Sequence, residues 1–361
     1  GKGMYLLPGF IDLHSHMNID RDIHRKTLWS FMVNLAYGVT TARDPQSMDI
    51  NIFTYADRVA IGDMIGPRVF TTGPGIFNNS PVNNLEDAKR IVQKYSDYYR
   101  VNTVKQYLSG NRRHRQLLNM AIQDAQLIPT TEGMDMKLMV TQIMDGYSLE
   151  HTLPHYPLYK DMIELIVQSG TYYDPTVIVG TGPRAEYYYW TRTDVHGNKK
   201  LNHFFPHDIL DLQTRRVPWF HESEFSYKEY AKTFKNIVNA GGKIGVGSHG
   251  EMQGICYHWE LWNIQSGGMS EMDALRCATI IGSEAIGFSN DLGSIEEGKL
   301  ADLILLTKNP LDDIRNTNSI KYVMKNGILY NADSLDEVWP TIKKLPPQYW
   351  HGKTPKHHDK Y

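Results

Sequence analysis

Short apolar segments alternate with longer amphipathic ones along most of this chain. Such alternation predicts parallel strands joined by crossover helices. Eight apolar segments can be placed, which is the number that closes a (β/α) barrel. They are 9–13, 37–42, 68–72, 102–107, 127–131, 147–150, 173–179 and 243–247. We therefore predict an α/β chain whose main domain, residues 8–290, is a (β/α)8 TIM barrel.

Several intervening helices carry recognisable boundary residues. Asn84 stands before an amphipathic segment with acidic residues in its first turn, as expected of an N-cap. Ser270 with Asp273 resembles a capping box. The segment 227–239 ends at a pair of glycines directly before the last apolar segment. These signals support helices between the predicted strands.

The stretch 180–225 interrupts the alternation of short apolar and longer amphipathic segments. It contains the aromatic run Tyr187-Tyr188-Tyr189-Trp190 and a hairpin-like segment at 194–198. Loops of this length are usually functional or disordered, and so many aromatic residues argue against disorder. Two interpretations stay open: an insertion that caps the pocket, or a packing surface for another domain.

After residue 290 the pattern changes to short strands without helices. Strands are predicted at 303–306, 321–324 and 328–330, and the last two flank the hairpin signal Asn326-Gly327. A sheet of so few strands is not stable alone and needs further strands to pair with. Residues 1–7 supply at most one such strand. We predict that 1–7 and 291–335 form part of a small, incomplete composite β-sandwich at the termini. Residues 336–361, rich in Pro, Lys and His, are predicted to be a mobile tail.

Composition narrows the range of partners. Lys and Arg total 38 against 40 Asp and Glu, a formal charge of −2. The chain therefore has no net positive charge that would attract a polyanion over a long range. Nucleic acid is not an expected partner. The two cysteines are too few for a disulfide framework. No apolar run approaches the length of a membrane span, and the N-terminus lacks the layout of a signal peptide.

Chemistry-bearing side chains follow the ends of several predicted strands. The first strand runs directly into His14 and His16. With 15 histidines in the chain, about 0.6 such His-x-His pairs arise by chance, so the pair alone proves nothing. Residues i and i+2 of a strand point the same way, however, and barrel active sites lie at the carboxyl ends of the strands. The position therefore predicts two imidazoles facing the barrel mouth.

The carboxyl ends of the predicted strands form the rim of the barrel mouth. Four further groups fall on this rim: Lys105 in the fourth strand, and Glu132, His151 and His249 at the ends of the fifth, sixth and eighth. Each also has a purely structural interpretation. Lys105 could reach solvent, Glu132 could form a rim ion pair, and His151 could be a core histidine with satisfied hydrogen bonds. Together the six groups predict a metal site with an open position.

Several segments of the chain are similar to the amidohydrolase superfamily. They are PGFIDLHSH, YGVTTARDP, NTVKQYL, YSLEHTLP, ALRCATIIGSEAIG and GSIEEGKLADLILL. The segments VKQYLSGNRRHRQ, SHGEMQGICYHWELW and IRNTNSIKYVMKNGILY more closely resemble the amidohydrolase domains fused behind TolB-like β-propellers. The resemblance covers nearly the whole chain. It implies a possible β-propeller domain before residue 1 and favours an extracytoplasmic location, while the compartment itself stays unknown.

The resemblance implies a binuclear centre. One metal would take His14, His16 and His249, the other Glu132 and His151, and a carbamylated Lys105 would bridge them. A hydroxide on the metals would attack a carbonyl that one of them polarises. Two Zn²⁺ ions suit these ligands, with manganese or iron as alternatives.

Two positions depart from the usual pattern of that superfamily. Glu132 stands where a histidine is usual, and His249 stands where an aspartate usually acts as ligand and general base. His249 could keep the role of the base, since imidazole takes up a proton near neutral pH. If His249 is only a ligand, Glu251 or His258 becomes a candidate for proton transfer.

Two residues are candidates for substrate contact. Arg43 could pair with a substrate carboxylate, or could form a structural ion pair with Asp44 beside it. His258 lies downstream of the eighth strand and is the second candidate.

Three functions are consistent with the sequence. The first is metal-dependent hydrolysis of a C–N bond in a non-peptide amide, a dipeptide or a cyclic amide. The second is a mononuclear deaminase or an imidazolonepropionase-like cyclic amide hydrolase that uses His14, His16, Glu132 and His249, with Lys105 unmodified. The third is a catalytically inactive barrel with a binding or assembly role. A small amide-type substrate is the expected partner, and a homo-oligomer is possible.

Overall fold

A computed structural model describes residues 2–77, 81–133, 135–152, 155–180 and 182–352. Eight parallel strands lie in two sheets that follow the chain order. The first sheet holds β2 (Phe10–Asp12), β3 (Val39–Asp44) and β4 (Arg68–Thr71). The second holds β5 (Thr103–Gln106), β6 (Ile128–Glu132), β7 (Ser148–Glu150), β8 (Tyr172–Asp174) and β9 (Lys243–Ile244). This α/β arrangement is consistent with the predicted TIM barrel.

Backbone hydrogen bonds join the two sheets at both ends. Leu13 N, just after β2, donates to Val246 O, just after β9, at 2.9 Å. On the other side Ile76 N donates to Lys105 O at 2.9 Å, and Tyr107 N donates to Ile76 O at 2.8 Å. The carboxyl ends of the first and last parallel strands therefore lie next to each other, as the placement of His14 and His249 on one rim requires.

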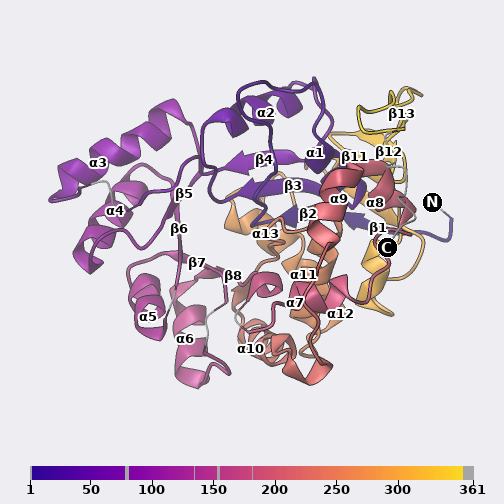
Figure 1. Ribbon diagram of the computed structural model, residues 1–361. Coiled ribbons are helices and arrows are strands. Elements are labelled where there is room, and N and C mark those ends of the chain that lie inside the picture. The colour runs from indigo at the N-terminus through magenta and orange to yellow at the C-terminus, as the bar shows by residue number, and fades with distance from the viewer. Residues whose placement is uncertain (1, 78–80, 134, 153–154, 181, 353–361) are drawn as a thin grey trace.

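Helices connect and cover these strands (Figure 1). They are α1 (Trp29–Ala36), α2 (Asn51–Ala60), α3 (Leu85–Gln93), α4 (Arg112–Asp124), α5 (Met136–Met144), α6 (Lys160–Ser169), α10 (Tyr227–Asn239), α11 (Ile255–Gln265), α12 (Glu271–Cys277) and α13 (Ile280–Ala285). The predicted caps are confirmed: the Asn84 side chain accepts from Asp87 N, and the Ser270 side chain accepts from Asp273 N. The helix predicted at 227–239 is α10.

The seventh predicted strand is shorter than expected. The segment 173–179 was predicted to be extended, but β8 ends at Asp174 and a 3-10 turn follows at Val177–Val179. The reason is local: Pro175 has no N–H to donate to a ladder, and Thr176 adopts a left-handed conformation with φ of 41°. The chain thereby turns away from the sheet at the rim.

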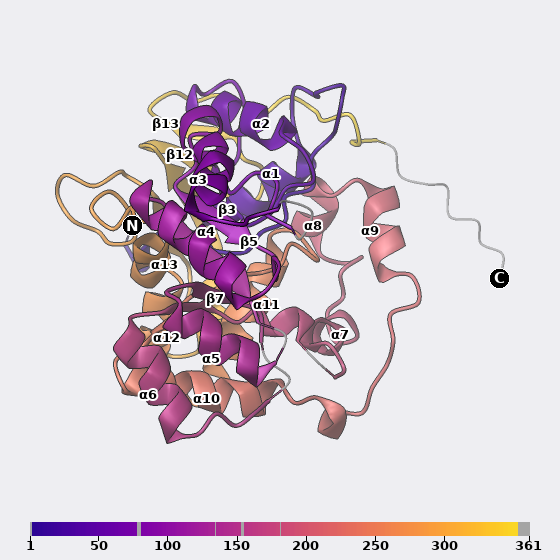
Figure 2. The same cartoon turned by 90° about the vertical axis from the view of Figure 1, so that its left-hand side faces the viewer.

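The interrupting stretch 180–225 contains three short helices in the described residues, α7 (Ala185–Trp190), α8 (Lys199–Phe204) and α9 (His207–Thr214), and a 3-10 turn at Glu222–Glu224. Figure 2 shows α8 and α9 side by side at the edge of the molecule. The hairpin-like segment is a turn in which Gly197 N donates to Asp194 Oδ1 at 2.8 Å. Tyr189 of α7 stacks on Trp259 of α11, with ring centroids 5.3 Å apart. Part of the aromatic run is therefore core.

The two ends of the described chain build one antiparallel sheet in the order β1-β10-β11-β12-β13. Its strands are β1 (Tyr5–Pro8), β10 (Leu303–Leu306), β11 (Ile320–Lys325), β12 (Ile328–Asn331) and β13 (Glu337–Trp339). The predicted hairpin is confirmed: Asn326 and Gly327 have φ of 50° and 78°, as a tight type I′ turn requires. The composite sandwich stays a prediction.

The start of the predicted mobile tail is ordered. Within 336–352, β13 pairs with β12, and Trp350 is 6% exposed, with its indole N–H donating to His203 O at 2.9 Å. The polar composition of this segment misled the prediction, because one strand and one indole suffice to attach it to the core. Residues 353–361 lie outside the described part.

Among the described residues, none of the helices combines the length and the apolar character that a membrane crossing needs.

Candidate metal centre

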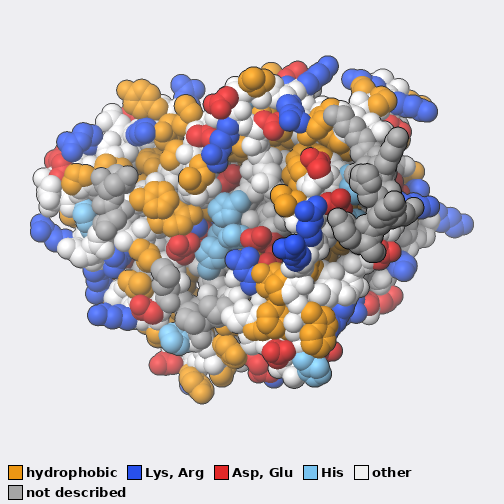
Figure 3. All heavy atoms as spheres, in the orientation of Figure 1, with side chains coloured by type: hydrophobic (Ala, Val, Ile, Leu, Met, Phe, Trp, Pro, Cys, Tyr) orange, Lys and Arg blue, Asp and Glu red, His pale blue; other side chains and the backbone are white. Residues whose placement is uncertain are grey.

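Four histidines meet at the carboxyl ends of the parallel strands. His14 and His16 follow β2, His151 follows β7, and His249 follows β9. Five pairs of these rings have centroids 4.6 to 5.2 Å apart. His14 is fully buried, whereas the other three side chains are 23 to 31% exposed. Figure 3 shows histidine side chains gathered near the middle of one face, beside acidic groups.

The backbone around these histidines is tightly constrained. Asp12 accepts hydrogen bonds from His14 N and from Ser248 N and Oγ, which fastens the end of β2 to the segment after β9. His151 and His249 both have left-handed backbone, with φ of 69° and 59°. Such conformations are uncommon for residues other than glycine and cluster at functional sites.

Each of the four imidazoles has a polar neighbour near Nδ1. In His151 and His249 this contact is a hydrogen bond, whereas the buried Nδ1 of His14 has no hydrogen-bond partner among the described residues. Nδ1 lies 3.3 Å from Asp174 Oδ2 in His14, and 3.8 Å from Asp44 Oδ1 in His16. In His151 it lies 2.7 Å from Thr176 Oγ1, and in His249 it lies 2.9 Å from Glu251 Oε1. Where Nδ1 donates to its partner, as that of His249 can to the carboxylate of Glu251, the tautomer is fixed and Nε2 is left as the ligand.

The Nε2 atoms of three of these rings face the cluster. His14 Nε2 and His16 Nε2 are 3.2 Å apart, and His151 Nε2 lies 3.4 Å from Glu132 Oε2. One ligand atom each from His14, His151 and His249 falls within a mutual distance of 4.8 Å. Four-coordinate zinc with bonds of about 2.0–2.1 Å places neighbouring nitrogens roughly 3.3 Å apart. The donor set and its spacing therefore fit a divalent metal.

Lys105 lies beneath the histidines, fully buried among charged groups. Its Nζ is 2.6 Å from Glu150 Oε2 and 3.4 Å from Glu132 Oε2. The other oxygen of Glu150 accepts a hydrogen bond from Arg43 Nη2 at 2.7 Å. One buried carboxylate thus bridges two cations, and Glu132 lies between Lys105 and His151.

The protonation states follow from burial and from these neighbours. Burial lowers the pKa of His14, and the positive charges of His151 and Lys105 lower it further, so the imidazole is neutral and free to bind a metal. Burial tends to raise the pKa of Glu150, but Lys105 and Arg43 outweigh it and hold that pKa at about 2. Burial opposes the charge on Lys105, yet Glu150 raises its pKa, so the ammonium form persists.

Arg43 is part of this buried network rather than an exposed anchor. It is 3% exposed and donates to Leu13 O, Thr103 Oγ1, Thr130 Oγ1 and Glu150 Oε1. Its ion-pair partner is Glu150, not the adjacent Asp44. Arg43 is therefore a structural residue, as one interpretation had it, but through Glu150 rather than the predicted Asp44, and its burial does not fit the predicted contact with a substrate carboxylate.

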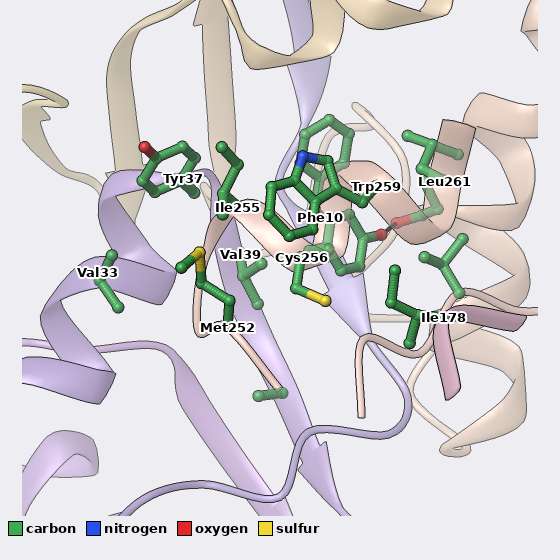
Figure 4. Close-up of a cluster of buried hydrophobic side chains, with 14 of the residues drawn as sticks. Phe10, Val33, Tyr37, Val39, Ile178, Met252, Ile255, Cys256, Trp259 and Leu261 are labelled. Carbon is green, nitrogen blue, oxygen red and sulfur yellow. Dashed lines mark hydrogen bonds between the residues drawn. The ribbon is translucent and has the colours of Figure 1, made fainter. Parts of the chain in front are cut away.

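His258 is not brought to the rim, which corrects its prediction as a substrate contact. The residue lies in α11, whose side chains pack against β2 and α1 (Figure 4). It has no exposed surface, and its Nδ1 and Nε2 lie 3.1 Å from Thr317 Oγ1 and 3.0 Å from Tyr37 O. Burial lowers its pKa to about 3. Glu251, the other candidate for proton transfer, is at the cluster beside His249.

Sequence reasoning missed two carboxylates, Asp174 and Glu150. Both end parallel strands, Asp174 in β8 and Glu150 in β7. Acidic residues that end a barrel strand were a usable signal for Asp174. Glu150 was overlooked because it is adjacent to His151. Adjacent strand residues point to opposite faces, so only one of the two was expected to face the site, and the histidine was the better ligand candidate.

The comparisons with known proteins agree with this fold. The model of the amidohydrolase family matches residues 5–329, and the chain belongs to that family. An ochratoxinase of Aspergillus niger is 27% identical over 110 residues, which cover 29% of this chain and only 23% of that protein. The match thus spans about a quarter of that relative.

Solved structures show the same fold across most of the chain. A Xaa-Pro dipeptidase with methionine in its active site has a TM-score of 0.67 at 22% identity, covering 91% of this chain and 87% of the other. Molinate hydrolase has a TM-score of 0.69 at 16% identity, covering 96% and 87%. For A. niger ochratoxinase the values are 0.66 and 18%, with coverage of 90% and 83%.

Proposed function

We propose that this chain is a metal-dependent hydrolase that cleaves an amide-type C–N bond in a small molecule. The carrying observation is the meeting of four rim histidines, among which one ligand atom each of His14, His151 and His249 lies within a mutual distance of 4.8 Å. Membership of the amidohydrolase family supports the reaction class. The names of similar structures, a Xaa-Pro dipeptidase and a phenylurea hydrolase among them, support a small substrate.

The ligands divide into two groups. In the binuclear version His14, His16 and His249 would hold one metal, and Glu132 and His151 a second. His151 lies close to both sets, since its ligand atom falls within 4.8 Å of those of His14 and His249. A bound divalent metal, zinc by preference for these donors, would lower the pKa of a water and polarise the substrate carbonyl. Asp174 and Glu251 would orient His14 and His249 through their Nδ1 atoms.

His249 has two roles open to it because of Glu251. A carboxylate on Nδ1 raises the basicity of Nε2, which can then bind a metal or take up a proton from the attacking water. Burial of His249 lowers its pKa, which keeps the ring unprotonated and able to act in either role.

One observation favours the mononuclear alternative, a deaminase or cyclic amide hydrolase. Carbamylation of Lys105 requires a neutral amine, but Glu150 at 2.6 Å stabilises the ammonium. With Lys105 kept as a cation, the bridge between two metals is missing, and His14, His16, Glu132 and His249 would serve a single ion. Binuclear assembly requires that metal binding and CO₂ displace the ion pair with Glu150.

Metal counting separates these versions. Zinc content is compared between wild type and a His14→Asn/His151→Asn double variant. The double variant should hold two ions fewer per chain if the site is binuclear, and one ion fewer if it is mononuclear. His221→Asn, at an exposed histidine that is not part of the cluster, is the matched control. Mass spectrometry at low temperature with ¹³C-bicarbonate would report a carbamate on Lys105.

Activity should be measured on a panel of N-acyl amino acids, dipeptides and cyclic amides. Removal of metal with a chelator should abolish turnover, addition of Zn²⁺ or Mn²⁺ should restore it, and His14→Asn should not be restored. If wild type loaded with metal hydrolyses none of the panel, a binding or assembly role replaces the proposal.

The closed barrel also belongs to the proposal. The bonds between Leu13 and Val246 and between Ile76 and Lys105 support one continuous (β/α)8 barrel. Fusion to a propeller, an extracytoplasmic location and a homo-oligomer stay predictions of the resemblance alone.

A further inference from the structure

A second group of potential ligands lies on the stretch 180–225, on elements other than those that carry the rim histidines. His196 precedes α8, and His207 and Asp211 are in α9. One ligand atom from each falls within a mutual distance of 4.8 Å. Nothing in the proposed hydrolysis uses these three residues.

The hydrogen bonds of His196 define its free nitrogen. Its Nε2 is 3.0 Å from Thr214 Oγ1, and that hydroxyl donates its own proton to Leu210 O at 2.8 Å. The hydroxyl must therefore accept from His196, which places the ring proton on Nε2. Nδ1 is left with a lone pair, and it lies 3.9 Å from Asp211 Oδ1. This is the arrangement by which outer partners orient a metal-binding imidazole.

His207 and Asp211 complete the group from one face of α9, since residues four apart are neighbours on a helix. His207 Nδ1 is 3.1 Å from Asp211 Oδ2. The contact lacks hydrogen-bond geometry, and among the described residues this buried nitrogen has no hydrogen-bond partner. A buried polar atom without a partner is costly, and a bound cation would satisfy it.

The backbone that carries His196 is held in place before any ion binds. Asn202 Nδ2 donates to the carbonyls of Val195, His196 and Asn198 at 3.2, 2.7 and 2.8 Å. The turn is closed by Gly197 N donating to Asp194 Oδ1. The three ligands therefore need only side-chain rotations to converge.

We propose that His196, His207 and Asp211 form a second metal site, separate from the rim, with water completing the coordination. Two imidazoles and a carboxylate favour Zn²⁺ over Mg²⁺ or Ca²⁺. The two histidine nitrogens lie 3.1 and 3.9 Å from different oxygens of Asp211, and all three ligand atoms lie within 4.8 Å, so small side-chain rotations would bring them to the roughly 3.3 Å between ligands of a tetrahedral zinc. The N-terminus of α9 opposes a cation at His207, and Asp208 in the same turn offsets that effect.

Such an ion would fix α9 against the turn at 194–197. α9 also reaches the rim, because Gln213 Nε2 donates to Glu251 O at 3.0 Å, and the Glu251 side chain contacts His249. The site is thus structural, and it attaches the stretch 180–225 near the residue that positions His249.

The test is zinc content after dialysis against micromolar ZnCl₂, measured by mass spectrometry on the full chain. Asp211→Asn and a His196→Gln/Asp211→Asn double variant should each hold one ion fewer than wild type. His221→Gln, an exposed histidine of the same stretch, should lose none. Introducing Asp211→Asn into His14→Asn should remove a further ion, which shows that the rim and the second site are independent.

Hydrogen exchange gives a readout that does not depend on counting. Addition of ZnCl₂ should slow amide exchange in 194–214 in wild type and in His14→Asn, but not in His207→Gln. Equal zinc content in wild type and the double variant, or exchange that ZnCl₂ does not change, would mean that these residues form an ion pair only, and would overturn the proposal. Circular dichroism of each variant checks folding, which substitutions at these partly exposed positions should preserve.

Discussion

The carboxylate of Asp174 lies 3.3 Å from Nδ1 of His14, on the side of the ring opposite to His16. Asp174 is buried, and neither of its oxygens has a hydrogen-bond partner among the described residues. Burial raises the pKa of Asp174 well above its usual value, and the charge of Glu150 adds to the effect. The arrangement is that of a carboxylate–histidine–metal triad before metal binding.

Asp174→Asn should therefore weaken metal binding by about 10- to 100-fold while the fold persists. With a metal on Nε2, the Asp174 carboxylate would accept the Nδ1 proton of His14, and the amide would accept it less strongly, so the ring would be held less firmly and Nε2 would be less basic. Competition with a chromophoric chelator would measure the change. Asp302→Asn, which removes another buried carboxylate far along the chain, is the control and should leave metal affinity unchanged.

The buried ion pairs of Glu150 make a different prediction, about stability. Glu150→Gln leaves Lys105 and Arg43 without their shared anion in a site that is almost fully buried. Breaking such a pair costs about 3–5 kcal/mol of unfolding free energy. Urea denaturation of the metal-free protein would measure it. Glu229→Gln, which breaks the exposed pair with Lys232, should cause little change, and an equally small effect in Glu150→Gln would contradict the network.

The sequence predicted the parallel strands and the rim histidines because both follow from a short-range rule. Strand periodicity and chain order alone place His14, His16, His151 and His249 at carboxyl ends. Their clustering then follows from the parallel sheets. The structure adds the orientation of the rings, which depends on Asp174, Asp44, Thr176 and Glu251 and on left-handed backbone that no periodicity reveals.

Arg43 and His258 show where local reasoning fails. Whether Arg43 faces substrate or the interior depends on Glu150, which is 107 positions away in the chain. His258 stands downstream of the last strand, but the helix that carries it is buried on nearly every side, so its position relative to the rim depends on tertiary packing.

His249→Asp tests what the histidine contributes to the site. If His249 is principally a ligand, the shorter carboxylate should retain metal and a measurable part of kcat, whereas His249→Ala should lose both. If its basicity is essential, the pH profile of kcat/KM should change shape in His249→Asp while metal content is kept. Glu251→Gln should shift the same profile without removing metal, since Glu251 acts through His249.

Glu260 in α11 makes a prediction about pH. Its two oxygens accept backbone hydrogen bonds from Val177 N at 2.7 Å and Ile178 N at 2.8 Å, directly after Thr176, the partner of His151. Burial raises the pKa of Glu260 to about 8, although the two N–H groups lower it. The folded state therefore binds more protons than the unfolded state between about pH 4.5 and 8.

The contribution of this carboxyl to stability is thus complete below about pH 4.5, falls as pH rises, and levels off above about pH 8. The slope cannot exceed about 1.4 kcal/mol per pH unit. Urea unfolding of wild type and Glu260→Gln from pH 5 to 9 measures the effect of this carboxyl together with its coupling to Asp174 and Asp12, because titrations that are not coupled to Glu260 cancel in the difference. The advantage of wild type should shrink toward pH 8 and then stay constant. A difference that does not vary with pH would mean that Glu260 is ionised throughout, stabilised by its two backbone donors.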